Sequence, residues 1–482
     1  MNKTQISGIL CLLFSQTFSF AQNKCDCEKA MSFVQKNIEK NSASFQHRII
    51  ENRNKKEYQN FKKNINQISK KLTTQKECVG LMSYYLSFFK DTHQFVGMSK
   101  EYYKPFDALP KDSLTVYKFL RENVENIPIK YENNKDSLEG DWFYKFDEVN
   151  ADIRVHIQKN TEKGKSYVGL ISKPLKYYAE IGDLKIDFYN RNHKLYAVFW
   201  NMFQAPSRAF EVSLDNGVLK IGKWYYFVRD KKDVVNFREK SDSTFVESLS
   251  DKTNYLRVKN FYYEEGEKID SLLKSNHQLI TAKENLIIDI RNNPGGSDYG
   301  FLPILPYIMD SKIYNNPIKA STWVSKENFK FYDESKYEYG VETKQDSIAA
   351  DHEIRELKKY LNKFEPADFT KDEIDTVYSF PKKIYIITNR NNASSAEDFI
   401  LRAKQSSKVK IIGQYTMGAL SYGEIREIKI PNFPASLYIT QRKMSFYNNE
   451  DFETIGLKPD IILDENKESE WKNITLKLIE EL

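Results

Sequence analysis

Two adjacent serines stand at the start of an expected helix, where a hydroxyl group could act as a nucleophile. The stretch TNRNNASSAEDFI, residues 388–400, follows an apolar run and opens a helical pattern. A serine in the first turn of a helix lies at the positive end of the helix dipole, which favours loss of its proton. The pattern Ser394-x-x-Glu397 is also typical of a capping box. On these residues alone, the structural role is favoured.

A second loop contains residues that could stabilise negative charge. The sequence RNNPGG follows the apolar run 286–290 and ends in Gly295 and Gly296. Glycine amides can point at a developing oxyanion, although Pro-Gly-Gly is also an ordinary turn. In a parallel sheet, ligands bind beyond the carboxyl ends of the strands. Since both loops follow apolar runs, we expect them at the same edge of one sheet.

Three kinds of pattern along the chain indicate three parts. Residues 22–105 have helical spacing, and their basic stretch 53–71 indicates the solvated face of an amphipathic helix rather than a nucleic-acid groove. Residues 138–250 consist of short β-branched and aromatic runs between turn residues, which predicts an inserted all-β, barrel-like module. Residues 255–482 alternate apolar strands with helices, which predicts an α/β domain with a helical insertion at 325–379.

The first 21 residues differ from the rest of the chain. Lys3 is followed by a mostly apolar run and by Ser19-Phe20-Ala21, which together are typical of a secretory signal peptide. The run is too short to span a bilayer stably, so we expect an exported protein without a stable membrane span. The whole chain has 482 residues, 40% of them hydrophobic, which is enough for folded domains. Its net charge of +6 is modest and indicates no particular partner.

Three cysteines follow the predicted signal peptide, namely Cys25, Cys27 and Cys78. In an oxidising compartment this odd number predicts one disulfide and one free thiol. Cys78 could pair with either Cys27 or Cys25. Neither histidines nor a second cysteine pair stand at the spacing of metal ligands, so we expect no metal site and no cofactor.

Four motifs in a fixed order carry a resemblance to a known family. They are LIIDIRNNPGG, ITNRNNASSAEDF, IIGQYTMGALSYGE and ETIGLKPDIIL. Together they resemble the C-terminal processing, or tail-specific, serine proteases and the related tricorn protease core. The resemblance implies an α/β catalytic domain of crotonase-like spiral β/α architecture that carries out acyl transfer on peptides. It also implies that Ser394 is the nucleophile and that the amides of Gly295 or Gly296, together with Ser395, are the oxyanion donors.

The general base departs from the pattern of the processing proteases. In that family a lysine follows the T-x-G triplet, whereas TMGAL places Ala419 at this position. The chain therefore resembles the tricorn-like branch, which uses a histidine and a glutamate. The resemblance points to His93 in KDTHQF and Glu453 in ETIGLKPD. A neutral imidazole can accept the hydroxyl proton while a carboxylate orients it, although His93 could also be a solvated residue at a helix end.

The leading hypothesis is an exported serine peptidase that acts on peptides or proteins, with no nucleic-acid partner. The alternative is a catalytically inactive peptide-binding protein that kept the fold after losing the lysine. A third hypothesis makes the β module a binder of small ligands or glycans. The family often carries a PDZ domain, but residues 100–250 lack its Gly-Leu-Gly-Phe-like loop. We expect the β module to replace that domain.

Overall fold

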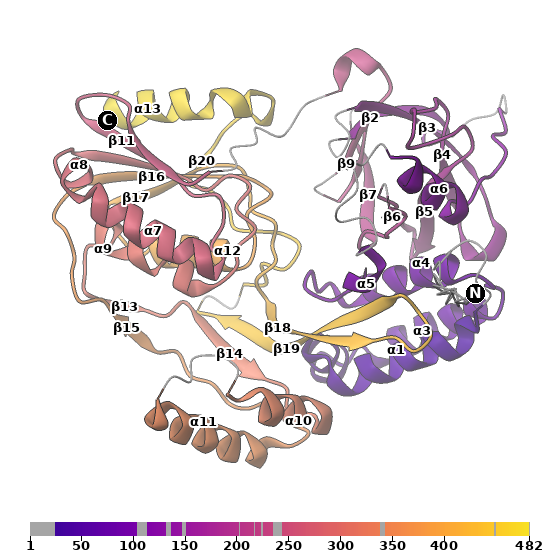
Figure 1. Cartoon of the computed structure of the whole chain (residues 1–482), viewed down its shortest axis with the longest axis horizontal. Coiled ribbons are helices and arrows are strands. Elements are labelled where there is room, and N and C mark those ends of the chain that lie inside the picture. The colour runs from indigo at the N-terminus through magenta and orange to yellow at the C-terminus, as the bar shows by residue number, and fades with distance from the viewer. Residues whose placement is uncertain are drawn as a thin grey trace, which may run out of the picture.

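A computed structural model describes most of the chain (Figure 1). The described residues are 25–103, 113–131, 136–146, 151–201, 203–215, 217–222, 225–234, 243–337, 343–447 and 450–481. The predicted signal peptide, residues 1–21, lies outside them. No helix in these ranges is both long enough and apolar enough to cross a membrane.

The N-terminal part is helical, and its central helix is buried. Helix α4 (Gln75–Leu86) has every residue buried, while α1 (Cys27–Asn41) and α3 (Lys55–Ser69) pack against it. Helix α3 buries its apolar positions at helical spacing, together with Ser69 at its end, which confirms the amphipathic helix expected there. A disulfide joins Cys27 to Cys78 and leaves Cys25 as a free thiol. Shorter elements complete this part: α2 (Ala43–Phe45), η1 (Gln46–Glu51), η2 (Ser87–Phe89), β1 (Phe95–Met98), α5 (Lys100–Tyr103) and α6 (Leu114–Asn123).

The predicted β module forms a closed eight-stranded barrel, which confirms its architecture. Antiparallel pairing runs from β2 to β9 in sequence order, and Phe143 opposite Val228 closes the circle. Alternate residues along the strands fill the interior, as Ile153, Val155 and Ile157 do. The strands are β2 (Gly140–Phe146), β3 (Ala151–Lys159), β4 (Tyr167–Ile171), β5 (Leu184–Arg191), β6 (Lys194–Phe199), β7 (Phe210–Asp215), β8 (Val218–Ile221) and β9 (Tyr225–Val228).

A six-stranded sheet forms the centre of the C-terminal part. Its order is β10-β11-β12-β16-β17-β20, and only the first pair is antiparallel. Strand β10 falls within the range predicted for the barrel module but pairs with β11 in this sheet. The strands are β10 (Phe245–Ser248), β11 (Thr253–Arg257), β12 (Asn285–Asp289), β16 (Lys383–Thr388), β17 (Val409–Gly413) and β20 (Ile461–Ile462).

Helices cover both faces of this sheet, as the continuous apolar strands predict. Leu286 and Ile288 pack into the cluster with α7 and α12, while Ile287 between them packs against Trp471 of α13 on the other face. Because β12 and β16 are parallel neighbours, the glycine loop and the serine loop follow them at the same edge. The helices are α7 (Tyr263–Ser275), α8 (His277–Thr281), α9 (Leu305–Ile308), α12 (Ser395–Ala403) and α13 (Trp471–Glu481).

A long ribbon connects the C-terminal part to the helical part. Strand β19 (Ala435–Phe446) pairs with β18 (Tyr422–Lys429), with β14 (Ile318–Thr322) and with β1 of the helical part. In Figure 1 the ribbon lies between the sheet and the helical region, and the barrel lies above that region. The insertion between β14 and β16 contains α10 (Lys326–Ser335), α11 (Lys344–Leu357) and β15 (Lys371–Glu373), the last of which pairs with β13 (Ile313–Asn315).

Candidate active site

Ser394 occupies a strained turn between β16 and α12. Its backbone dihedral angles are φ 54° and ψ −126°, a region that residues with a side chain rarely adopt. The half-buried serine is fixed there because its amide donates a hydrogen bond to the carbonyl oxygen of Ala419 at 3.1 Å. Surrounding contacts therefore hold the hydroxyl-bearing residue in a conformation that an isolated helix start would not require.

Hydrogen bonds to the Glu397 side chain stabilise this turn. Its fully buried carboxylate accepts hydrogen bonds from the amides of Ser394 at 3.2 Å, Gly418 at 2.8 Å and Ala419 at 2.8 Å. The hydroxyl of Thr416 also donates to it. The residue thus makes the expected contact with the N-terminus of the helix and also binds the loop in which Ala419 replaces the family lysine.

The two glycines lie directly against the serine turn. A Cβ atom on Gly295 would come within 2.5 Å of the Ala393 carbonyl oxygen, and one on Gly296 within 2.5 Å of the Tyr262 amide nitrogen. Both glycines have positive φ, 90° and 142°. Only glycine therefore fits at either position.

Two of the three expected oxyanion donors are available. The Gly295 amide donates to the side chain of Asn293 at 2.9 Å, so it is already used. The amides of Gly296 and Ser395 have no acceptor within the described ranges. Of the three expected donors, Gly296 and Ser395 thus have amides that could bind an oxyanion, while Gly295 shapes the turn.

Asparagines lock the glycine loop to the serine loop. The Asn292 amide donates to the Asn389 side chain at 3.0 Å, and the Asn389 side chain donates back to that of Asn292 at 3.0 Å. The side chains of Asn391 and Asn392 add bonds to Asn292 and to the Ile290 carbonyl oxygen. These buried or half-buried bonds fix the Gly296 amide relative to Ser394.

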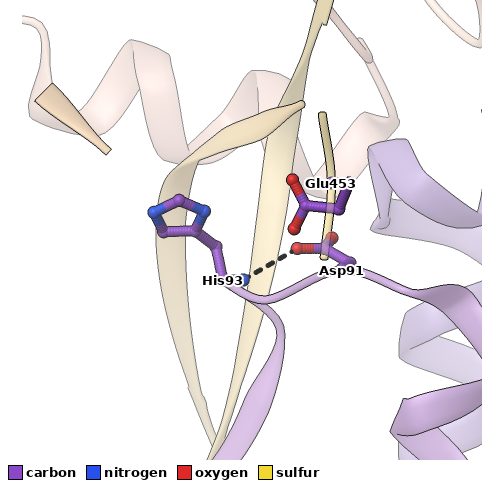
Figure 2. A group of neighbouring side chains, drawn as sticks. All are labelled: Asp91, His93 and Glu453. Carbon is purple, nitrogen blue, oxygen red and sulfur yellow. Dashed lines mark hydrogen bonds between the residues drawn. The ribbon is translucent and has the colours of Figure 1, made fainter. Parts of the chain in front are cut away.

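His93 lies in the loop that leads into β1, beside two carboxylates. Nitrogen and oxygen atoms of Asp91, His93 and Glu453 lie within 4.8 Å of one another, a spacing that a metal ion could also bridge. Figure 2 shows the two carboxylates next to each other and the imidazole turned to one side of them. Within the described residues, the His93 ring makes no hydrogen bond to Ser394 or Glu453, and its Nδ1 atom is buried without a partner.

Burial keeps the imidazole neutral. Desolvation, with a smaller contribution from the nearby positive charge of Arg208, lowers the pKa of His93 to about 4. At neutral pH the ring is therefore unprotonated, which is the form that can accept a proton from a serine hydroxyl.

Glu453 is buried and heavily hydrogen-bonded. Its Oε1 atom accepts from the Thr92 amide at 2.6 Å and from the Thr92 hydroxyl, and its Oε2 atom accepts from the amides of Leu420 at 3.1 Å and Ser421 at 2.8 Å. Burial and the charge of Asp91 nevertheless raise the pKa of Glu453 to about 8. Burial also raises the pKa of Asp91, whose carboxylate accepts from Thr440 and from the His93 amide.

One short path of contacts joins Ser394 to the loop that carries His93. Ser394 binds Ala419, the next residue Leu420 binds Glu453, and Glu453 binds Thr92, which precedes His93. The structure thus brings together residues that lie about three hundred and sixty positions apart in the sequence. The interpretation of the motifs did not single out Thr92, the asparagine lock or Arg208. Both loops contain the pattern Arg-Asn-Asn, at residues 291–293 and 390–392. This repeat was the only signal in the sequence for any of these residues.

Comparisons with known proteins show what this chain is similar to. Residues 252–463 match the model of peptidase family S41. Among curated proteins none matches the sequence. The structure of mature CPAF complexed with lactacystin is similar at a TM-score of 0.51 and 13% identity, over 94% of this chain and 98% of that one. A putative peptidase from Parabacteroides merdae gives 0.43 and 12%, over 94% and 97%. The photosystem II D1 C-terminal processing protease gives 0.39 and 11%, over 91% and 93%.

The likeness to CPAF concerns the fold, and it extends over the helical part, the barrel and the sheet together. The family match covers the range that contains the glycine loop, the serine loop and Glu453. Residues 252–463 are thus similar to the peptidases of family S41, which supports a serine-type peptidase.

Proposed function

We propose that this chain is an exported serine peptidase with Ser394 as nucleophile, His93 as general base and acid, and Glu453 as the carboxylate that supports His93. We further propose that its catalytic domain has the crotonase-like spiral architecture. The observation that carries the proposal is the strained Ser394 turn, which stands against two free amides and is linked by hydrogen bonds to the Glu453 and Thr92 contact.

In the reaction, Ser394 Oγ bonds to the peptide carbonyl carbon while its proton passes to the His93 ring. The amides of Gly296 and Ser395 stabilise the resulting oxyanion. When the carbon–nitrogen bond breaks, His93 gives the proton to the leaving amine. Water then hydrolyses the acyl-enzyme by the same proton transfers in the second half of the reaction.

The two carboxylates support the imidazolium as a pair. Burial next to each other raises the pKa of both Asp91 and Glu453. Negative charge on this pair stabilises His93 when it is protonated. The four donors on Glu453 keep that charge close to the ring.

Labelling with a fluorophosphonate probe tests the nucleophile. The purified mature protein should be labelled, and Ser394→Ala should remove the label while circular dichroism stays unchanged. Ser395→Ala is the matched control, because it removes the neighbouring hydroxyl and keeps Ser394. Undiminished labelling of Ser394→Ala would contradict the assignment. Sequencing the N-terminus of protein recovered from an exporting host tests the predicted cleavage after Ala21.

Two observations favour a second function, a peptide-binding protein without catalysis. Ala419 replaces the lysine of the processing proteases, and His93 makes no hydrogen bond to Ser394 in the described structure. Under this alternative, peptides would bind without being cleaved and no probe would label the wild-type chain. Mass spectrometry of a peptide library after incubation distinguishes the two functions.

A further inference from the structure

A short segment after the last strand of the sheet reaches back to both loops of the candidate active site. It is η9 (Glu465–Glu470), which leads into helix α13. The backbone carbonyl oxygen of Glu468 accepts a hydrogen bond from the Arg291 side chain, and its carboxylate accepts one from the Asn389 side chain at 2.7 Å. Arg291 begins the glycine loop, and Asn389 lies in the serine loop. One residue of η9 therefore contacts both loops.

A buried tryptophan fixes this segment against the central sheet. Trp471, the residue directly after η9, is fully buried in one cluster with Ile287 of β12 and Ile387 of β16. Its ring nitrogen donates a hydrogen bond at 2.9 Å to the carbonyl oxygen of Asp464, the residue directly before η9. Both ends of the segment are thus held by a side chain of the close-packed core, so that Glu468 stands on a rigid support.

The side chain of Asn389 is the centre of the asparagine lock. Its Oδ1 atom accepts hydrogen bonds from the backbone amides of Asn292 at 3.0 Å and of Asn391 at 3.1 Å, one in each loop. Its Nδ2 atom donates to the Asn292 side chain at 3.0 Å and to Glu468. Because a backbone amide can only donate, the lock works only when the oxygen of the Asn389 side chain faces these two amides.

Glu468 favours this orientation of the Asn389 side chain. An ionised carboxylate can only accept, so it stabilises the orientation that turns the NH₂ group toward it and opposes the flipped one. Burial raises the pKa of Glu468, but the charges of Arg291 and Arg390 act in the opposite sense and favour the ionised form. Asn389 is only 2% exposed, so water cannot readily replace a lost partner.

We propose that Glu468 is a positioning residue, which orients the Asn389 side chain and thereby holds the glycine loop and the serine loop in register. The inference rests on the proposed peptidase function, because these loops carry Gly296 and Ser394. A change at Glu468 should therefore act on the rate of the chemical step more than on the binding of substrate. Glu468 lies beyond residues 252–463, the range that matches the family.

Steady-state hydrolysis of a cleaved library peptide tests the role of the carboxylate. Glu468→Ala should lower kcat by about 10- to 100-fold with little change in KM, because a misplaced oxyanion donor slows the chemical step. Glu468→Gln should restore most of kcat, since its side-chain oxygen can accept the same hydrogen bond. If Glu468→Ala does not fold, Glu468→Leu, which keeps the bulk of the side chain without an acceptor, takes its place.

Glu465→Ala is the matched control for these variants. It removes another carboxylate of η9, whose partner in the serine loop is Arg390 at 3.5 Å, and leaves the bonds of Asn389 intact. It should keep the wild-type kcat. A loss of kcat in Glu465→Ala as large as that in Glu468→Ala, or equal losses in Glu468→Ala and Glu468→Gln, would overturn the proposal.

A double-mutant cycle tests whether Glu468 acts through Asn389. Asn389→Ala removes the side-chain amide and should lower kcat at least as much as Glu468→Ala does. In the Asn389→Ala background, Glu468→Ala should change kcat by less than about twofold, because no amide is left to orient. Two losses that multiply would contradict a role through Asn389.

Hydrogen exchange in the Ser394→Ala background makes the test independent of catalysis. Mass spectrometry should show that Glu468→Ala removes protection in both segments 291–297 and 389–395, while barrel strand β5 exchanges as before and Glu465→Ala changes neither segment. If the wild-type chain cleaves nothing and this loss of protection is present, the peptidase function fails and the positioning role stands. If cleavage occurs and Glu468→Ala changes neither kcat nor protection, the positioning role fails.

Discussion

The loop that carries Ser394 is held by hydrogen bonds on both sides, whereas the loop that carries His93 leaves buried polar atoms without partners. Glu397 and the asparagine lock satisfy the first loop within the peptidase domain. The second loop belongs to the helical part, and its imidazole Nδ1 has no partner among the described residues. The proposed nucleophile and oxyanion donors thus lie in a loop whose hydrogen bonds are already made, whereas the ring of the proposed base has a nitrogen atom without a partner among the described residues.

Replacing His93, the proposed base, should have the largest effect on the rate of peptide hydrolysis. His93→Gln should lower kcat by about 10³- to 10⁴-fold, because it removes the group proposed to take the proton of Ser394. Steady-state hydrolysis of a cleaved library peptide measures the effect. His352→Gln, on exposed α11, is the matched control and should retain wild-type activity. A fall of less than tenfold for His93→Gln would show that the base lies elsewhere.

A change in the glycine loop beside Ser394 should have the second-largest effect on the rate. Gly296→Ala should reduce kcat by about 10²- to 10³-fold, since it displaces an oxyanion donor. It should also lower the melting temperature, because the added carbon would approach Tyr262. Gly217→Ala is a suitable comparison, because its φ is also positive while a Cβ there meets no atom within 4 Å. It should cost stability without a comparable loss of kcat.

Activity should be lost at an unusually low pH when the solution is acidified. With the pKa of His93 lowered to about 4, the neutral form persists as the pH falls, and activity is lost only near pH 4. At pH 5 kcat/KM should retain about 90% of its neutral value, whereas an unperturbed histidine would leave about 3%. An acid limb near pH 6.5 would mean that the ring is solvated in the working enzyme.

The smallest expected effect is on the pH dependence of stability. Because the folded-state pKa of Glu453 is raised to about 8, its contribution to stability is fully present below about pH 4.5 and is lost as the pH rises through 8. In Glu453→Gln the unfolding free energy should therefore decline less steeply between pH 5 and 8. Urea unfolding at several pH values measures the slope. Identical slopes would contradict the raised pKa.

The spacing of apolar and capping residues in the sequence predicted individual strands and one helix start. Alternating apolar residues such as Ile153, Val155 and Ile157 predicted the barrel strands, and continuous apolar runs predicted the parallel strands beneath Gly295 and Ser394. The capping box predicted the contact of Glu397 with the serine turn.

Contacts between distant segments could not be predicted in this way. The bonds between Asn292 and Asn389, which join the glycine loop to the serine loop, link residues 97 positions apart. Arg208 reaches the His93 loop because the barrel packs on the helical part, and no spacing in the sequence specifies that packing. The role of His93 itself was inferred from resemblance, since a single histidine in a loop carries no periodic signal.

The pairing of β1 with β19 also bears on when the enzyme can first become active during its synthesis. Strand β1, which follows His93, finds its partner about three hundred and forty residues later, and Glu453 comes later still. During synthesis the proposed base, His93, is therefore made long before the strand that pairs with its loop and before Glu453. If His93 and Ser394 act as proposed, a chain that ended before β19 would be inert rather than an uncontrolled protease.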